Sequence, residues 1–87
     1  MSEIKKAAER EMKRMKTVFS KIKKKTPKAT EFYEFAHNYY SDGLYFHDKK
    51  KYVESFEAFI IAWAYLDAGL KLGYFSVPKD HKKWFTA

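Results

Sequence analysis

The sequence has no cysteine, only three glycines and no long apolar run, and each of these features excludes a class of site. Without cysteine there is no disulfide, no thiolate metal site and no thiol nucleophile. The glycines stand alone at positions 43, 69 and 73, so there is no glycine-rich phosphate-binding loop. The longest apolar run, Ala58 to Leu66, is far shorter than the roughly 20 residues that span a bilayer. No membrane partner is therefore expected.

The N-terminal residues lack the apolar core and cleavage site of a secretory signal. Together with the absence of cysteine, this predicts a cytoplasmic protein. The chain of 87 residues contains 8 Phe, 7 Tyr and 2 Trp, and each such side chain can bury roughly 150 to 250 Å². Because bulky core residues compensate for a short chain, we expect residues 1–87 to form one compact domain.

Positive charge is concentrated in the first third of the chain. Residues 1–28 contain eleven Lys or Arg and three acids, whereas residues 29–87 contain seven and eight. The first segment therefore carries all the excess behind the net charge of +7. Such a segment either meets nucleic acid or an acidic protein surface, or forms a solvated face.

Apolar residues recur at helical spacing in three segments, which predicts an all-α fold, a three-helix antiparallel up-and-down bundle. The helices are expected at about residues 2–25, 27–49 and 51–72, with a tail, 73–87, packed on the bundle. The first helix carries an apolar stripe that includes Met15 and Phe19, and Ser2 is its expected N-cap. The second is expected to begin with Thr26 as N-cap and Pro27 in its first turn.

The second helix carries small residues seven positions apart, Ala29, Ala36 and Gly43, along the middle of its apolar half. Small residues at this spacing form a shallow trough into which another helix can settle. Glycine inside a helix costs about 1 kcal/mol relative to alanine, and close packing would offset that cost at Gly43. The alternative is a turn at residues 41–43, Ser-Asp-Gly, which would interrupt the periodicity.

The third helix is apolar nearly all round. Such a helix is normally covered on more than one side, either by the other helices and the tail or by another subunit. Gly73 is expected just after its C-cap. Its main face comprises Val53, Phe56, Phe59, Ile60, Trp63, Ala64, Leu66 and Leu70, with Glu54, Ser55 and Glu57 as the polar residues of its back. The interface candidates are Ile61, Tyr65 and Ala68 on that back, and Trp84 and Phe85 in the tail.

From Tyr39 to Phe75 the sequence combines an aromatic pair, Ser-Asp-Gly, a lysine-rich link, YVESFEAF, AWAYLDAGLKLG and a closing aromatic residue. In this combination it resembles an archaeal family known as domain of unknown function 357. The resemblance implies a small three-helix up-and-down bundle, and the basic first helix is of the kind that this family carries. The family has no assigned activity, cofactor or partner, so the resemblance leaves the function open.

A row of basic residues lies opposite the apolar stripe of the first helix. It could track the phosphates of a nucleic acid, each neutralised phosphate adding to a salt-sensitive affinity. The alternative is a solvated lysine-rich face. The nucleic-acid-binding candidates are Lys6, Arg10, Lys13, Arg14, Lys21 and Lys24.

Asp67 projects from the main apolar face of the third helix, where an unpaired carboxylate would be costly. His47 and Tyr40, on the apolar half of the second helix, are its expected partners. The three residues would form either a small polar pocket or a hydrogen-bonded contact that fixes the helix register.

Neither catalytic residues nor a metal or cofactor is expected. Glu34, His37 and Ser41 share the polar side of the second helix, but nothing supplies an oxyanion hole or a substrate cleft. The histidines are too widely spaced for a zinc pattern. The sequence therefore predicts a non-enzymatic interaction module that binds a protein partner or a second copy of itself. The alternative is a nonspecific nucleic-acid-binding accessory protein that uses the basic row.

Overall fold

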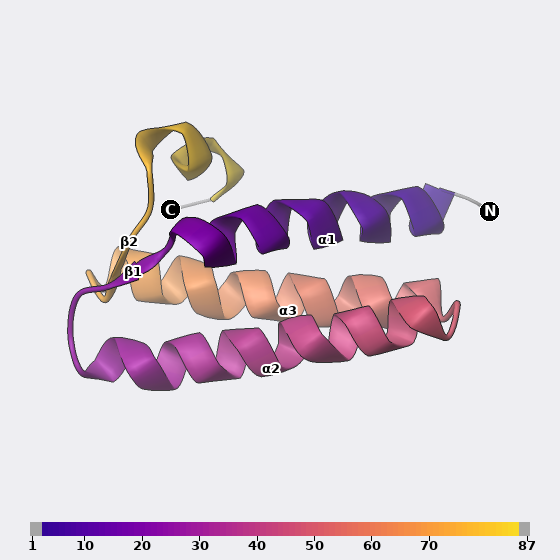
Figure 1. The fold of residues 1–87 in the computed structure, drawn as a ribbon, viewed down its shortest axis with the longest axis horizontal. Coiled ribbons are helices and arrows are strands. Elements are labelled where there is room, and N and C mark those ends of the chain that lie inside the picture. Colours follow the sequence, from indigo (N-terminus) through magenta and orange to yellow (C-terminus); the bar gives the residue numbers. More distant parts are fainter. Residues whose placement is uncertain (1–2, 86–87) are drawn as a thin grey trace.

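The structure is a computed structural model that describes residues 3–85, and it is an all-α bundle of three long helices. The chain runs up, down and up again through α1 (Glu3–Lys21), α2 (Lys28–Asp48) and α3 (Tyr52–Lys71) (Figure 1). α3 packs against both α1 and α2, which touch each other much less. The predicted fold class is confirmed. No helix within residues 3–85 is long and apolar enough to cross a membrane.

α1 buries its apolar stripe, and Ala8, Met15 and Val18 are fully covered. The helix ends at Lys21, so the predicted end near residue 25 was wrong. The chain leaves the helix to form a short strand, β1 (Lys23–Lys24). The expected N-cap, Ser2, lies outside the described residues.

β1 pairs antiparallel with a second short strand, β2 (Phe75–Ser76), and the ribbon joins the α1–α2 connection to the segment after α3 (Figure 1). Lys23 lies opposite Ser76, and the Lys25 N–H donates a hydrogen bond to the Tyr74 carbonyl oxygen at 2.8 Å. A run of lysines carries no strand signal of its own. Main-chain bonds to a distant segment decide its conformation, so the sequence did not reveal this ribbon.

α2 begins as predicted, within one residue. Pro27 already has helical torsions, φ −59° and ψ −32°, and the Thr26 carbonyl oxygen accepts a hydrogen bond from the Ala29 N–H at 3.0 Å. The helix then continues without interruption across Ser41, Asp42 and Gly43 to Asp48. The alternative of a turn at this site is excluded.

Gly43 lies against the ring of Phe59 on α3, and both residues are buried. A Cβ placed on Gly43 would lie 2.3 Å from Phe59 Cε1 and 2.5 Å from Cδ1, which is too close for two carbon atoms. Beside this contact, Ser55 Oγ donates a hydrogen bond to the Gly43 carbonyl oxygen at 2.8 Å. The Phe59 ring therefore fills the predicted trough at Gly43, and Ala36, two turns away on the same face, is also fully buried.

The buried face of α3 is rotated from the predicted one. Val53 and Ile60, expected in the core, are 54% and 44% exposed, whereas Ser55, expected on the polar back, is fully buried. Small side chains decide the orientation, because they let helices approach closely, and a count of apolar residues does not reveal this. The buried residues of α3 are Ser55, Ala58, Phe59, Ala62, Leu66 and Gly69.

α3 ends in a Schellman motif at Gly73, whose φ is +77°. The Gly73 N–H donates a hydrogen bond to the Leu70 carbonyl oxygen at 3.1 Å, and the Tyr74 N–H donates one to the Gly69 carbonyl oxygen at 2.8 Å. The expected helix end is confirmed.

The tail packs back on the bundle. After Pro78 the chain forms a short 3-10 helix, η1 (Lys79–Trp84), beside α1 (Figure 1). Phe85 then meets Trp63 of α3 edge to face, with ring centroids 5.1 Å apart. α3 is thus covered by α1, by α2 and in part by the tail, as a helix with so much apolar surface requires.

Candidate functional site

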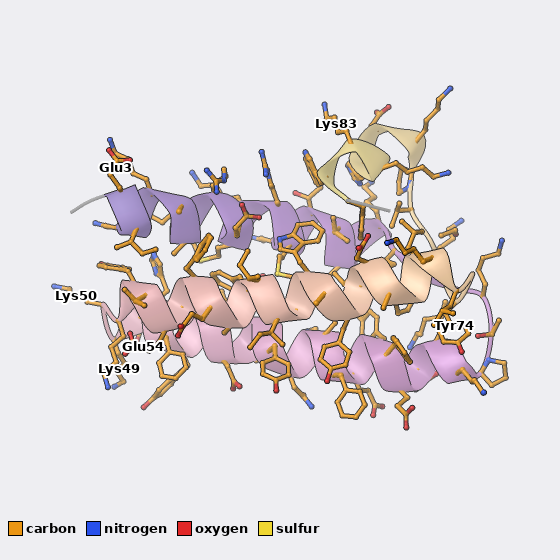
Figure 2. The ribbon with its side chains drawn as sticks, turned by 180° about the vertical axis from the view of Figure 1, so that it is seen from behind. Glu3, Lys49, Lys50, Glu54, Tyr74 and Lys83 are labelled. Carbon is orange, nitrogen blue, oxygen red and sulfur yellow. The ribbon has the colours of Figure 1, made fainter. Side chains whose placement is uncertain are left out.

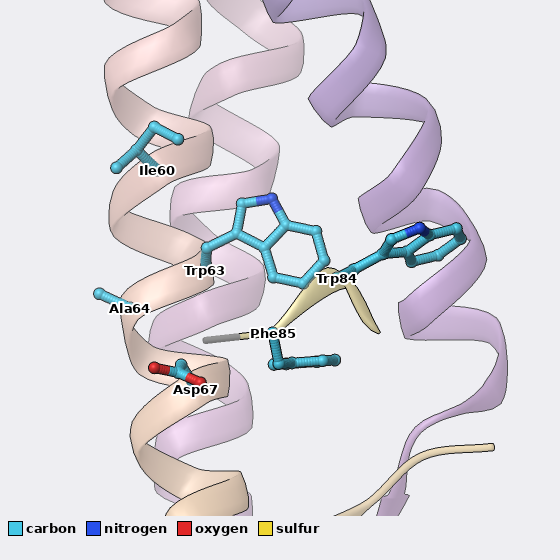
Figure 3. Close-up of a pocket in the computed structure, with 6 residues that line it drawn as sticks. All are labelled: Ile60, Trp63, Ala64, Asp67, Trp84 and Phe85. Atoms are coloured by element: carbon cyan, nitrogen blue, oxygen red, sulfur yellow. The ribbon is translucent and has the colours of Figure 1, made fainter. Parts of the chain in front are cut away.

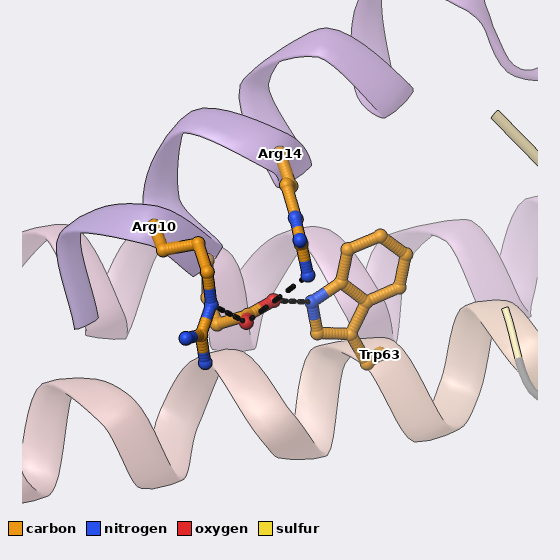
Figure 4. A network of polar contacts seen from close by, with 4 residues as sticks. Arg10, Arg14 and Trp63 are labelled. Carbon is orange, nitrogen blue, oxygen red and sulfur yellow. Dashed lines mark hydrogen bonds and ion pairs between the residues drawn. The ribbon is translucent and has the colours of Figure 1, made fainter. Parts of the chain in front are cut away.

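A buried carboxylate, Glu11, connects α1 to α3 (Figure 4). Trp63 Nε1 donates a hydrogen bond to Glu11 Oε1 at 2.8 Å. On the other oxygen, Arg10 Nε donates at 2.8 Å and Arg14 Nη1 lies 3.6 Å away. Both carboxylate oxygens have partners, which a buried charge requires. The network fixes α1 on α3 and is structural.

This network engages both arginines of the predicted basic row, although their side chains stay partly exposed. Arg10 and Arg14 turn to the buried carboxylate, and the Arg14 guanidinium also lies 5.9 Å from the centre of the Trp84 ring. Lys24 belongs to β1, and its Nζ lies 4.6 Å from the centre of the Tyr33 ring. The other members, Lys6, Lys13 and Lys21, are exposed. The row is therefore no continuous line of cations.

The predicted pocket of Asp67, His47 and Tyr40 is not assembled. The His47 ring lies beside Tyr52 at the start of α3, and its Nε2 is 3.2 Å from Glu9 Oε2. Because α2 and α3 are antiparallel, Asp67 lies roughly 22 Å further along the α3 axis from that point. Asp67 instead borders a hollow near the tail. Asp67 and His47 therefore lie at different heights of the bundle, and Asp67 lies on the outward side of α3.

Tyr40 is part of the aromatic packing between the helices. Its ring centroid lies 5.1 Å from that of Phe19 and 6.0 Å from that of Phe59. Burial raises the pKa of the Tyr40 hydroxyl above its ordinary value of 10.0. Glu34, His37 and Ser41, which share the polar side of α2, are exposed and line none of the hollows described below.

The outward side of α3 carries three hollows in a row, and Figure 2 shows α3 in front, uncovered by another helix. The first, of about 260 Å³, is lined by Ile60, Trp63, Ala64, Asp67, Trp84 and Phe85 (Figure 3). The second, of about 500 Å³, is lined by Phe56, Glu57, Ile60 and Ile61. The third, of about 240 Å³, is lined by Tyr39, Asp42, Phe46, Glu54, Glu57, Ala58 and Ile61. Neighbouring hollows share lining residues, so they form one surface, the outer α3 face.

The outer α3 face is apolar and acidic. Ile60 and Ile61 at its centre are 44% and 40% exposed. In the described part of the chain, its charged lining residues are Asp42, Glu54, Glu57 and Asp67, and no lysine or arginine lines any of the three hollows. Its charge is thus opposite to the net +7 of the whole chain. Such a surface can receive apolar side chains that are flanked by cations.

The interface candidates divide between this face and the interior. Ile61 lies at the centre of the outer α3 face, and Ala68 and Trp84 are half-buried. Tyr65 is covered by aromatic rings of α2, including Phe35 at a centroid distance of 5.2 Å. Phe85 is 9% exposed and belongs to the core, although its edge borders the first hollow. Tyr65 and Phe85 therefore pack within the chain.

The chain matches one known protein family and one solved structure. A family model described as protein of unknown function DUF357 matches residues 5–75. The chain belongs to this family. The match includes α1, so it extends beyond the resemblance seen from Tyr39 onward. A crystal structure of the DUF357 protein AF1782 from Archaeoglobus fulgidus is similar, with a TM-score of 0.77 and 26% identity over 87% of this chain and 95% of that chain.

No curated protein matches the sequence. The DUF357 description states that the function is unknown, so a function for this chain has to be argued from its own surfaces.

Proposed function

We propose that this DUF357 protein is a non-enzymatic, cytoplasmic interaction module that docks a protein partner on the outer α3 face. The observation that carries the proposal is the row of connected hollows, which is apolar and whose charged lining residues, among those that the structure describes, are acids. An amphipathic helix, with apolar residues on one side and Lys or Arg beside them, fits a long surface of this kind. The acidic rim would orient it and raise its association rate.

Charge favours such a partner over a second copy of this chain. In a two-fold dimer the same patch meets itself, so residues of one outer α3 face would contact the same set on the other. That contact would bring Glu57 of both copies into an interface whose described lining residues include no lysine or arginine. Burying carboxylates without cations is costly, whereas a basic helix would neutralise them.

The test uses model helices as probes. A peptide of leucine and lysine at helical spacing is titrated into the protein, with a leucine and glutamate peptide of equal length as its counterpart. Both tryptophans of the chain, Trp63 and Trp84, line the first hollow, so their fluorescence reports its occupation. We expect only the lysine peptide to shift it. Because the whole protein is cationic, its net charge repels the lysine peptide and attracts the glutamate peptide. Attraction by net charge alone would therefore give the opposite result.

Variants then locate the site. Ile61→Glu should weaken binding of the lysine peptide about tenfold or more, because the apolar contact is replaced by a charge that must be desolvated. Leu44→Glu, at a similarly exposed apolar position of α2, should leave it unchanged. Equal effects of the two variants, or no response to the lysine peptide, would overturn the proposal. A concentration-dependent dimer abolished by Ile61→Glu would replace it with self-association.

A further inference from the structure

The β1–β2 ribbon gathers two lysine clusters from distant parts of the sequence at one end of the bundle. A hollow of about 210 Å³ there is lined by Lys21, Lys23, Ser76, Val77 and Pro78, directly before η1. Figure 2 shows Tyr74 at this end, Lys83 above the same half of the bundle, and Lys49 and Lys50 at the opposite end. We name it the lysine end, comprising Lys21, Lys23, Lys24, Lys25, Lys28, Lys79, Lys82 and Lys83, all of them exposed.

The charge of the lysine end is hardly compensated. Residues 21–31 and 76–85 together contain eight lysines and two acids, Glu31 and Asp80. Glu11 pairs with the two arginines and Glu9 lies against His47, so neither of these carboxylates neutralises the lysine end. The ammonium groups of the lysine end therefore retain their charge for an external anion.

We infer that the lysine end binds the phosphate backbone of nucleic acid, without reading its sequence. A dense set of lysines displaces condensed counterions from such a polyanion, and this release drives nonspecific binding. The chain's exposed large apolar residues, from Phe35 to Leu72, all lie outside these two segments. The lysine end thus lacks the apolar anchors on which a protein interface or a membrane-surface segment depends.

The residue types of the lysine end favour contacts with the phosphate backbone of a nucleic acid over contacts with its bases. Arginine, asparagine and glutamine are the side chains that typically form paired hydrogen bonds with a base. Residues 21–31 and 76–85 contain none of them. The nearby rings are already engaged: Tyr33 lies under Lys24, and Trp84 stacks on His81 at a centroid distance of 4.8 Å. Because the rings of Tyr33 and Trp84 already make contacts within the chain, duplex should bind at least as well as a single strand.

The experiment measures fluorescence anisotropy of a labelled 20-base-pair DNA duplex and of its single strand. We expect Kd values in the range of roughly 1 to 100 µM, and log Kd should rise with log salt by about 0.9 for each phosphate contacted on the duplex. The triple variant Lys23→Glu, Lys25→Glu, Lys82→Glu should weaken duplex binding about tenfold or more and flatten that slope. Thermal melting confirms that each variant is folded.

The matched control, Lys49→Glu, Lys50→Glu, Lys51→Glu, changes the net charge equally at the opposite end and should retain most of the affinity. A third variant, Lys6→Glu, Lys13→Glu, Lys16→Glu, probes the exposed face of α1 and should also bind. Equal losses in all three variants would show attraction by net charge alone and overturn the assignment. Absence of duplex binding at low salt, a marked preference for the single strand, or equally effective competition by polyglutamate would do the same. None of these outcomes depends on the outer α3 face.

Discussion

At Gly43 the missing side chain decides how closely α2 and α3 approach. Gly43→Ala would bring a methyl group to within 2.3 Å of the buried Phe59 ring. Overpacking costs about 1–3 kcal/mol, which outweighs the roughly 1 kcal/mol that alanine gains in helix propensity. We expect the free energy of unfolding to fall by up to about 2 kcal/mol, measured by urea titration.

Two controls isolate the clash at Gly43. Asn38→Ala, at an exposed position of α2, should not destabilise the protein, because alanine is the better helix former. In a Phe59→Leu background Gly43→Ala should cost less, since the obstructing ring is gone. If the cost stays the same in that background, the Phe59 contact is not its cause.

The bond between Trp63 and Glu11 is the second residue-scale prediction. Trp63→Phe keeps an aromatic ring but leaves Glu11 Oε1 without its donor. Hydrogen bonds to charged groups contribute about 1.5–3 kcal/mol, so we expect the free energy of unfolding to fall by about that amount. Combined with Glu11→Leu, which removes the acceptor, the same change should cost less than the sum of the two single effects. Strict additivity would mean that the bond contributes nothing.

Tyr40 should make stability depend on alkaline pH. Because burial raises the pKa of its hydroxyl, the folded state holds this proton more tightly than the unfolded state does. The contribution is fully present below the ordinary pKa of 10.0 and is lost as the pH rises through the raised value. Tyr40→Phe should therefore show a smaller loss of stability above about pH 10 than the natural chain does. Parallel stability curves for the two proteins would contradict this.

Some residue-scale features could be predicted from the sequence, and others could not. The trough could be predicted from the spacing of Ala29, Ala36 and Gly43, because helical geometry alone places these three residues on one face. Ser55 and Glu11 were missed, since polarity assigns both to the surface. Their partners, the Gly43 carbonyl and the Trp63 indole, lie on other helices. A sequence pattern does not show which distant group will satisfy a buried polar side chain.

At the scale of elements, two helix ends require a left-handed residue. Gly73 after α3 has φ +77°, whereas Lys50 after α2 has φ +61° and carries a side chain. That conformation costs an L-residue roughly 1–2 kcal/mol, so Gly73→Ala should destabilise the protein by about 1 kcal/mol. Lys50→Gly should stabilise it by up to about 1 kcal/mol. Thermal melting should show opposite shifts of about 4–8 °C per kcal/mol.

Lys49, the neighbour of Lys50, provides the control for these two helix ends. Its φ is −87°, so Lys49→Gly relieves no strain and only adds freedom to the unfolded chain. We expect this variant to lower the melting temperature. A rise for both Lys49→Gly and Lys50→Gly would show that glycine acts through something other than φ.

The presence of each helix was easier to predict than the side of the helix that is buried. The three helices followed from periodicity, and the stop at Gly73 followed from its residue type. The rotation of α3 could not be predicted in this way, because apolar residues surround the whole helix and the small residues determine which side is buried. The β1–β2 ribbon could not be predicted either, since its hydrogen bonds join segments about fifty residues apart and neither has a strand pattern.

At the scale of the whole molecule, charge is segregated between two surfaces. The outer α3 face carries acids among apolar residues, and the lysine end carries cations without exposed apolar ones. The fold produces this separation by packing α1 on one side of α3 and by pairing residues 23–25 with residues 74–76 in the ribbon. The two proposed partners therefore need not compete, and each set of variants can be tested in the presence of the other ligand.

The same segregation should make the stability rise with salt. Lysines gathered at one end repel one another in the folded state, and this repulsion is relaxed when the chain unfolds. The Debye length shortens from roughly 30 Å at about 0.01 M salt to roughly 8 Å at about 0.15 M, so added NaCl should raise the free energy of unfolding. In the triple variant Lys23→Glu, Lys25→Glu, Lys82→Glu, each change removes two positive charges, and the net charge falls from +7 to +1. Its stability should respond less to salt, as urea titrations at both concentrations would measure. A decrease with salt in the natural chain would mean that attraction between opposite charges, such as the arginines and Glu11, outweighs repulsion among the lysines.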